Sequence, residues 1–558
     1  MEQVRLFLAI GLSFLVLLAW SYFFSGRPRD AVIPPETPTA ASDTQPAHST
    51  DPPLTPTVPD MALGVETAPP VASAPAPRPT PEEKRIVVET PHYVATLSTL
   101  GATFHDFVLT RFKETAAPDS PQKNMLPESF RDGMLQASFS LNTIPGLENA
   151  AFSVDLETDK LVVKDRKQTL SFEWMSDSGV RVRKIFGFDP ASYLVSYQVE
   201  IENLSGQPLH DALALSMHYP AMEDKGHSFT GPIALINNAL EQVKIKKIKE
   251  GIAQPGKIEW IAYDDKYFIY SMIPETPADG IMKLSLRDAT LVSQLVNPEF
   301  RIPPGGRETF TFYMFMGPKS MDVLKGAGHN LDKALNFGFF NIIAKPCLWF
   351  MNKIYSVVPN YGIAIIILTL FIKILLWPLG NKSYKSMNEM KKLQPLMVEL
   401  REKYKDDKQK MNQEIMGLYR TYKINPMGGC LPMFLQFPVF IAFYQMLYQA
   451  IELRHAPFFL WINDLSAPDR LFQFGFTIPL MEPPYGIPVL TLMMGASMFL
   501  QQKMAPPPGD PAQARMMMFL PVIFTFIFIN FSSGLVLYWF VNNVLSIGQQ
   551  YYIQRKRN

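Results

Sequence analysis

The chain has 558 residues, which is enough for two or three domains, and its formal net charge of +1 gives no case for nucleic-acid readout. Hydrophobic residues make up 47% of the sequence and concentrate in residues 1–24 and from Leu331 onward. The middle has the composition of a water-soluble protein, so we predict a membrane protein that carries a large soluble insert.

Residues Leu6 to Phe24 are apolar throughout and are about as long as one bilayer crossing. A cleaved signal peptide is the alternative, but its apolar stretch is usually ~7–15 residues long and ends at small residues. This run instead ends in Trp-Ser-Tyr-Phe-Phe. We therefore expect an uncleaved N-terminal transmembrane anchor over residues 1–27.

Residues 28–84 read as a flexible linker. Fifteen of the 54 residues from Pro28 to Pro81 are proline, and Ala, Thr, Ser and Asp fill the gaps. Such a composition cannot bury enough apolar surface to fold, so the segment should be an extended tether.

Residues 85–318 change to short alternating runs broken by turn sequences such as Pro-Pro-Gly-Gly. The clearest run places Tyr193, Val195, Tyr197, Val199 and Ile201 on one face, and further strands are expected at Ile86–Glu89 and Thr309–Met316. Many short strands predict a β-sandwich. The membrane topology predicted below places this domain in the periplasm. Its scattered histidines show no catalytic spacing and are read as structural.

Residues 319–360 form an amphipathic region. From Leu331 to Tyr355 the apolar residues are interrupted by Lys333, Lys345 and Lys353, so the segment is too polar to cross a bilayer. We predict a helix that lies along the outer membrane surface, with a buried globular helix as the alternative.

The remaining chain, 361–558, predicts five transmembrane helices at about 361–380, 431–450, 487–501, 516–531 and 533–552. The run from Met516 to Ile547 is too long for one helix, and Phe531-Ser532-Ser533-Gly534 would form a tight turn in its middle. A single tilted span is the alternative. With the anchor, the fold class is a polytopic α-helical membrane protein of six transmembrane helices, five of them in the core.

Basic residues decide the orientation. The segment from Asn381 to Asn425 carries eleven Lys/Arg against six Asp/Glu, the loop near 503–515 is basic, and the chain ends Arg555-Lys556-Arg557. Positive loops belong in the cytoplasm, and only the hairpin at 531–534 places all three there. Both termini are then cytoplasmic. Within residues 381–428, two Met-rich stripes predict a cytoplasmic helical hairpin, whose role, structural or substrate-contacting, stays open.

Lys373 lies within the predicted crossing at 361–380. An ionisable group there costs roughly 2.5–3.5 kcal/mol and usually faces a polar cavity, although its stem could instead reach toward the cytoplasmic surface. Polar residues on the same and neighbouring helices favour a wet groove: Thr369, Gln436, Ser533, Tyr538, Asn542 and Asn543.

Several motifs occur in the order that a known family shows. They are Asn425-Pro426-Met427-Gly428-Gly429-Cys430-Leu431-Pro432 with Gln436-Phe437-Pro438, Leu453-Arg454-His455-Ala456-Pro457-Phe458, Trp461-Ile462-Asn463-Asp464-Leu465-Ser466, and Ser533-Gly534-Leu535-Val536-Leu537-Tyr538-Trp539. From Leu331 to the C-terminus the chain resembles the YidC-type membrane protein insertases of the Oxa/YidC/Alb family. The anchor, linker and β-domain resemble the Gram-negative form.

The resemblance implies a substrate groove lined by Lys373, Thr369, Gln436, Tyr538 and Trp539, with no catalytic residue. Lys373 stands where bacterial members usually carry an arginine, which keeps the charge but loses the planar guanidinium. Trp539 stands where relatives often have a second tyrosine.

The resemblance also implies an inner-membrane insertase and chaperone that is not an enzyme and needs no cofactor or metal. Its expected partners are nascent membrane-protein substrates, the lipid bilayer, the Sec translocon and, transiently, the ribosome. No phosphate-binding loop is present, so hydrophobic partitioning and the membrane potential would drive insertion. Two rival functions stay open: a small-molecule transporter, and an envelope enzyme whose β-domain acts on carbohydrate.

Overall fold

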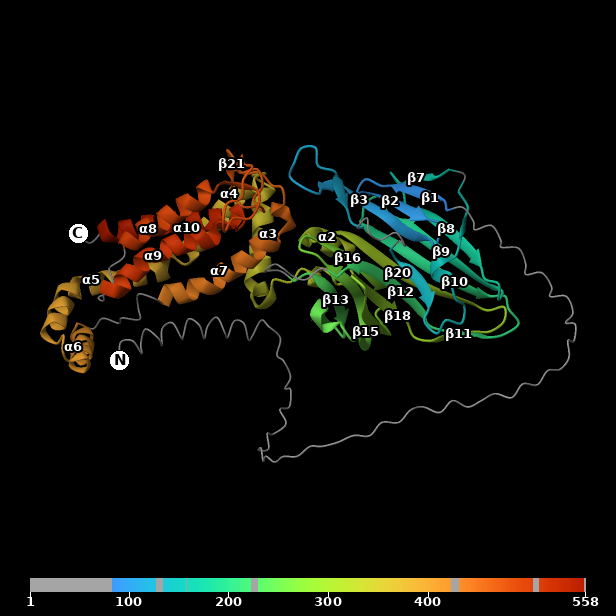
Figure 1. The fold of residues 1–558 in the computed structure, drawn as a ribbon, viewed down its shortest axis with the longest axis horizontal. Coiled ribbons are helices and arrows are strands. Elements are labelled where there is room, and N and C mark those ends of the chain that lie inside the picture. Colours follow the sequence, from blue (N-terminus) through green and yellow to red (C-terminus); the bar gives the residue numbers. More distant parts are fainter. Residues whose placement is uncertain are drawn as a thin grey trace, which may run out of the picture. The chain divides into compact units, whose positions relative to one another are not determined.

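The computed structural model describes residues 83–126, 134–156, 158–221, 229–422, 431–504 and 511–555 (Figure 1). The predicted anchor, nearly all of the Pro-rich linker and the motif at 425–430 lie outside these residues.

A β-rich domain runs from β1 to β20 and contains two large sheets (Figure 1). One sheet has five strands in the order β4-β3-β2-β1-β7. The other has thirteen, in the order β5-β12-β18-β17-β15-β16-β20-β10-β9-β8-β6, with β13 and β14 attached through β15. The strands are β1 Arg85–Glu89, β2 Tyr93–Ser98, β3 Thr103–Lys113, β4 Gln122–Asn124, β5 Gln136–Phe139, β6 Ser153–Val154, β7 Lys160–Val162, β8 Gln168–Met175, β9 Val180–Phe188, β10 Leu194–Asn203, β11 Leu209–Asp211, β12 Leu213–Pro220, β13 Gly231–Ile236, β14 Ala239–Gln242, β15 Ile252–Asp264, β16 Phe268–Pro274, β17 Ala278–Arg287, β18 Thr290–Val296, β19 Phe300–Ile302 and β20 Arg307–Pro318.

Aromatic side chains join the two sheets. Phe104 of β3 meets Phe186 of β9 edge to face at 5.4 Å, and Phe186 packs on Tyr197 of β10 at 4.8 Å. The predicted alternation along β10 is confirmed, because Val195 and Tyr197 are buried while the residues between them are partly exposed. A large β-rich domain is therefore confirmed.

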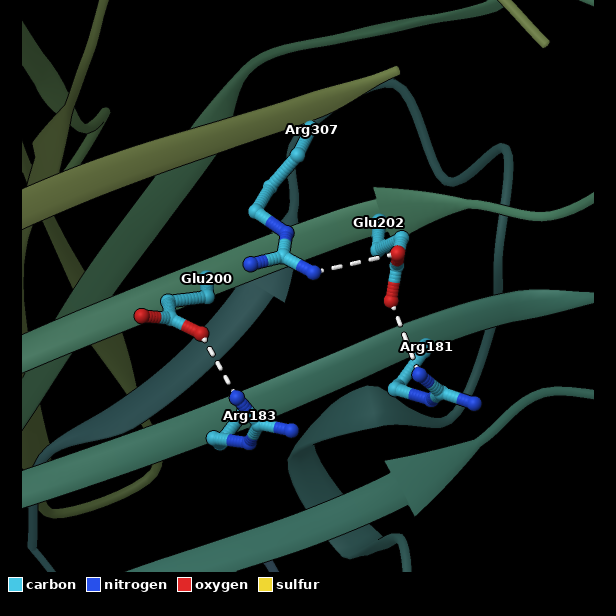
Figure 2. Close-up of a pocket in the computed structure, with 5 residues that line it drawn as sticks. All are labelled: Arg181, Arg183, Glu200, Glu202 and Arg307. Atoms are coloured by element: carbon cyan, nitrogen blue, oxygen red, sulfur yellow. Dashed lines mark hydrogen bonds and ion pairs between the residues drawn. The ribbon is translucent and has the colours of Figure 1, made fainter. Parts of the chain in front are cut away.

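The other face of β9, β10 and β20 carries a ladder of opposite charges (Figure 2). Arg183 pairs with Glu200 at 3.0 Å, and Glu202 pairs with Arg181 at 2.9 Å and with Arg307 at 3.1 Å. These cross-strand pairs are partly exposed and contribute little stability each. The hollow that they line measures about 10 Å³, room for a single water molecule at most, so it is not a ligand site.

The chain after β20 is mainly helical, apart from the short strands β21 Leu471–Phe474 and β22 Tyr485–Ile487. Its helices are α2 Met321–Ala327, α3 Asn341–Tyr355, α4 Tyr361–Leu375, α5 Trp377–Lys403, α6 Lys408–Thr421, α7 Leu431–Gln449, α8 Val489–Met504, α9 Pro511–Phe528 and α10 Ser533–Arg555, with 3-10 turns at η3 Leu331–Ala334, η4 Gly338–Phe340 and η6 Ile451–Leu453. The predicted amphipathic helix thus begins only at Asn341. Gly338, with φ of +67°, interrupts any continuous helix before it.

One predicted break and one predicted continuous helix have different outcomes. The hairpin at 531–534 is confirmed, since α9 ends at Phe528, α10 begins at Ser533, and Phe528 packs against Trp539 at 4.6 Å. The segment predicted as 361–380 instead divides into α4 and α5 with a bend of 64°. Pro378, in the first turn of α5, lacks the N–H that would continue α4.

By length and apolar composition, none of the described helices alone would cross a bilayer. The bent pair α4 and α5 meets those criteria together, and Arg515–Phe528 is a shorter apolar helix.

Lys184 of β9 is fully buried between the two sheets. Its Nζ donates a hydrogen bond to the carbonyl oxygen of Gly101 at 2.5 Å and lies 4.7 Å from the centre of the Phe152 ring. Burial lowers the pKa of this ammonium to about 7, because water no longer solvates the charge.

Replacing Lys184 with Met should stabilise the β-rich domain and flatten its pH dependence. Folding lowers the lysine pKa from 10.5 to about 7, so wild-type stability should rise as pH increases through that window. Below it the folded domain buries a charge, at a cost on the order of 1.4 kcal/mol per unit of pKa shift. Urea unfolding of residues 85–318, followed by tryptophan fluorescence, should show a larger gain for Lys184→Met at about pH 6 than at about pH 9.

The exposed Lys257 supplies the control, because Lys257→Met changes the same chemical group without burial. Equal pH dependence in the wild type and Lys184→Met would contradict the assignment of a buried ammonium.

Candidate functional site

The Lys373 ammonium lies between α4 and α10. Its Nζ donates a hydrogen bond to Oγ of Ser546 at 2.7 Å, and the Ser546 hydroxyl donates to the carbonyl oxygen of Asn542 at 2.7 Å. The side chain is partly buried, and no carboxylate of the described residues forms an ion pair with it. A cation held by neutral oxygens keeps its capacity to attract an anionic group.

One face of α10 carries a polar stripe, defined here as Asn542, Ser546 and Gln549, spaced four and three residues apart. Gln436 of α7 donates from Nε2 to Oδ1 of Asn542 at 3.1 Å. Gln549 donates from Nε2 to the carbonyl oxygen of Trp377 at 3.2 Å and to Oδ1 of Asn381 at 3.1 Å. Polar groups of α4, α5 and α7 therefore converge on α10, and Lys373 and Gln436 contact it one turn apart.

Thr369, a predicted groove residue, takes a different place. Its hydroxyl donates to the carbonyl oxygen of Ile365 on its own helix at 2.6 Å, and the residue is 2% exposed. This local bond satisfies the hydroxyl within α4. The structure does not join Thr369 to the polar stripe.

Tyr538 and Trp539 lie in an aromatic cluster. Tyr538 stacks on Phe443 with ring centres 4.7 Å apart and is 4% exposed. Trp539 packs edge to face against Phe440 at 4.5 Å. Both side chains pack α10 against α7, and Trp539 also contacts α9 through Phe528.

The loop between α7 and α8 contributes a clamp that sequence analysis missed. Arg470 is 8% exposed, and its guanidinium binds backbone carbonyl oxygens on two sides. Nε donates to Pro484 at 2.8 Å, and Nη1 donates to Ile529 at 2.8 Å, beyond the end of α9. Nη2 also donates to Oδ1 of Asn530 at 3.2 Å. One side chain thus ties the loop to the α9–α10 turn.

Asp469 holds the start of α8 in the same loop. Its Oδ2 accepts hydrogen bonds from the backbone N–H groups of Leu490 and Thr491, and its Oδ1 accepts from Nε1 of Trp461 at 2.5 Å. A carboxylate at a helix N-terminus satisfies unpaired N–H groups and complements the helix dipole. The only signal in the sequence was an Asp-Arg pair in an apolar loop, which specifies neither partner.

Comparisons with known proteins cover nearly all of the described chain. The family model described as 60Kd inner membrane protein matches residues 353–558, and the model described as YidC periplasmic domain matches residues 85–350. A protein of Syntrophus aciditrophicus named membrane protein insertase YidC is 43% identical over 86% of this chain and 86% of its own. A protein of Syntrophobacter fumaroxidans with the same name is 41% identical over 99% of this chain and 100% of its own.

A solved structure titled "Active YidC insertase crystal structure with the first transmembrane domain resolved" is also similar. It shares 19% identity and covers 85% of this chain and 93% of its own, with a TM-score of 0.37. Family membership rests on the sequence matches, which span both the β-rich domain and the helices.

Replacing Arg470 with Lys should lower the thermal stability of the helical region. Lysine keeps the charge but cannot direct donors to several carbonyl oxygens at once, and a buried acceptor left unpaired costs about 1–3 kcal/mol. Melting of the purified protein in detergent should shift to lower temperature, whereas Arg420→Lys on the exposed face of α6 should leave it unchanged. Identical melting of Arg470→Lys and wild type would show that the clamp contributes no stability.

Proposed function

Because the chain belongs to the YidC family of inner-membrane protein insertases with a periplasmic domain, we propose that it inserts its substrates through a hydrophilic, positively charged groove centred on Lys373. The observation that carries the proposal is the convergence of Lys373 and Gln436 on the polar stripe of α10. Polar side chains gathered between apolar helices give a substrate a place to keep its polar groups hydrogen-bonded.

The physical task is to move a polar segment past hydrocarbon. Each unsatisfied polar group costs several kcal/mol there, on the order of 2–7 kcal/mol without a hydrogen bond. The Lys373 charge attracts acidic residues of the translocating segment, and Gln436 and the stripe offer exchangeable hydrogen bonds. The apolar part of the substrate then leaves sideways along α7 and α9 into lipid. We assign no step to Thr369, Tyr538 or Trp539 beyond shaping the helices that form this path.

The proposed topology places both termini and the α5–α6 hairpin in the cytoplasm, with six transmembrane helices including the N-terminal anchor. Arg470 and Asp469 then close the groove on the outer side. The hairpin has its own packing, since Leu393 and Met411 are buried and the Tyr419 hydroxyl contacts Sδ of Met397 at 3.4 Å. Such packing favours a structural role for part of the Met-rich stripe.

A chaperone role, cooperation with the Sec translocon and transient ribosome contact belong to the same proposal. They follow from the resemblance of the motifs, and the exposed basic hairpin supplies a surface for ribosome contact. No catalytic step is required of any residue in this mechanism.

The charge at position 373 is tested directly by an insertion assay in proteoliposomes. We expect Lys373→Arg to insert substrates like the wild type, because the cation is kept. Lys373→Ala should insert acidic-flanked substrates roughly tenfold more slowly, equivalent to about 1.4 kcal/mol, and Lys373→Glu should fail with them. Lys392→Glu, the same charge reversal on the exposed surface of α5, is the control for net charge.

Equal insertion by all four residues at position 373 would show that the lysine only reaches toward the membrane surface. A folded Lys373→Glu protein, verified by unchanged melting, is required for either conclusion.

Deleting residues 85–318 separates insertion from the rival function of a carbohydrate-active envelope enzyme. An insertase whose groove lies within 361–558 should retain insertion of a small substrate protein after the deletion. Full-length protein and the deletion variant are compared in the same proteoliposomes, with solute uptake measured in parallel. Complete loss of insertion by a folded deletion variant would place the activity in the β-rich domain, and solute uptake without insertion would favour a transporter.

A further inference from the structure

A cavity of about 200 Å³ lies between α2 and α3, apart from the polar stripe of α10. It is lined by Met321, Asp322, Trp349, Asn352, Lys353 and Ser356. The first two belong to α2 and the others to α3 or the residue that follows it. Its walls carry one carboxylate, one ammonium, one amide and one indole ring.

One end of the cavity favours a cation that can donate hydrogen bonds. Oδ1 of Asn352 is buried and accepts no hydrogen bond from the described residues, while its Nδ2 donates to Oε1 of Glu452 at 3.4 Å. Burial and the nearby Asp322 charge raise the pKa of the Glu452 carboxyl, which favours its neutral form and leaves Asp322 as the carboxylate of the cavity wall. The Asp322 carboxylate and the unpaired amide oxygen together form a site for a protonated amine.

The other side chains of the cavity suit a ligand that carries both a positive and a negative charge. Trp349 is 58% exposed and presents an indole ring, the aromatic surface that cations bind best. Lys353 follows on the same helix, with the Ser356 hydroxyl beside it, and neither Lys353 nor Asp322 forms an ion pair with another described residue. Because the Lys353 ammonium and the Asp322 carboxylate line one cavity without pairing, both can bind a ligand that carries a positive and a negative charge.

The exposed face of α3 indicates where such a ligand would come from. Ile342 is 83% exposed and lies seven residues before Trp349, on the same side of the helix, and Phe339 just before α3 is 80% exposed. A helix with a large exposed apolar face and basic residues nearby is typical of the bilayer surface. The inference rests on the proposed function as a membrane insertase and on the predicted position of α3 along the outer membrane surface, which together put the cavity at the level of lipid headgroups.

We propose that the cavity binds the phosphoethanolamine headgroup of a membrane phospholipid. The primary ammonium of the lipid donates to Asp322 and to Oδ1 of Asn352 and lies against the Trp349 ring, and Lys353 binds the phosphate. A trimethylammonium headgroup cannot donate to the amide oxygen, and a glycerol headgroup supplies no cation for Asp322. The site therefore discriminates between lipids of the same chain length.

The test is native mass spectrometry of the full-length protein in detergent, titrated with phosphatidylethanolamine, phosphatidylcholine or phosphatidylglycerol of identical acyl chains. We expect the first to bind about tenfold more tightly than the other two. Asp322→Asn should remove that preference, whereas Lys353→Gln should weaken the binding of all three lipids, because each carries the phosphate. Lys325→Gln, on the exposed part of α2 outside the cavity, should keep the preference.

Soluble competitors identify the source of the ligand. O-phosphoethanolamine should displace the lipid only weakly because it lacks the acyl chains, and inorganic phosphate should not displace it. Equal binding of the three lipids by the wild type would overturn the proposal, as would a preference that survives Asp322→Asn or unchanged lipid binding by Lys353→Gln. Tight binding of free O-phosphoethanolamine would replace the lipid with a soluble ligand and overturn it too.

The lipid-binding experiment can fail or succeed independently of the proposed groove mechanism. Lys373→Ala should bind phosphatidylethanolamine like the wild type while inserting acidic-flanked substrates more slowly. Loss of lipid preference in Asp322→Asn with unchanged melting establishes a site that does not depend on the groove charge.

Discussion

A lysine ammonium within an apolar helix has to be solvated by protein, and the arrangement of α10 follows from that constraint. Removing water from a charge is costly unless oxygens replace it, and here Ser546 does so at 2.7 Å. Asn542 lies one turn away and binds Gln436, so the polar contacts of two helices share one face of a third. Tyr538 lies one turn before Asn542 on the same face of α10 and stacks on Phe443, so the side of α10 that contacts α7 is aromatic near its start and polar further along.

The need to satisfy buried polar groups also explains the contacts in the loop between α7 and α8. An irregular segment between two apolar helices exposes carbonyl groups that no helix satisfies. The Arg470 guanidinium donates hydrogen bonds to the carbonyl oxygens of Pro484 and Ile529. The Asp469 carboxylate accepts hydrogen bonds from the N–H groups at the start of α8. The two adjacent residues act on opposite kinds of unpaired backbone group. Their opposite charges also limit the net cost of burying them together.

Sequence reasoning succeeded where the signal was local. The alternation of Val195 and Tyr197 repeats every two residues, and the turn at 531–534 interrupts a run too long for one helix. Lys373 was found because a charge in an apolar run is conspicuous. The sequence did not identify its hydrogen-bond partner Ser546, because Ser546 lies 173 positions away and serine is common in helices. Thr369 was expected in the groove by its spacing, yet its hydroxyl found a nearer acceptor in Ile365. Arg470 depends on carbonyl oxygens, which every residue carries, so no sequence pattern marks its partners.

The 64° bend between α4 and α5 gives the molecule a pivot. Only Leu376 separates the two helices, and α5 continues for 27 residues, roughly 40 Å at 1.5 Å per residue. A swing of about ten degrees at that point carries the far end of α5 about 7 Å, but it moves Lys373, three residues from the pivot, by less than about 1 Å. A swing of the far end of α5 can therefore leave the hydrogen bond between the Lys373 ammonium and Ser546 in place.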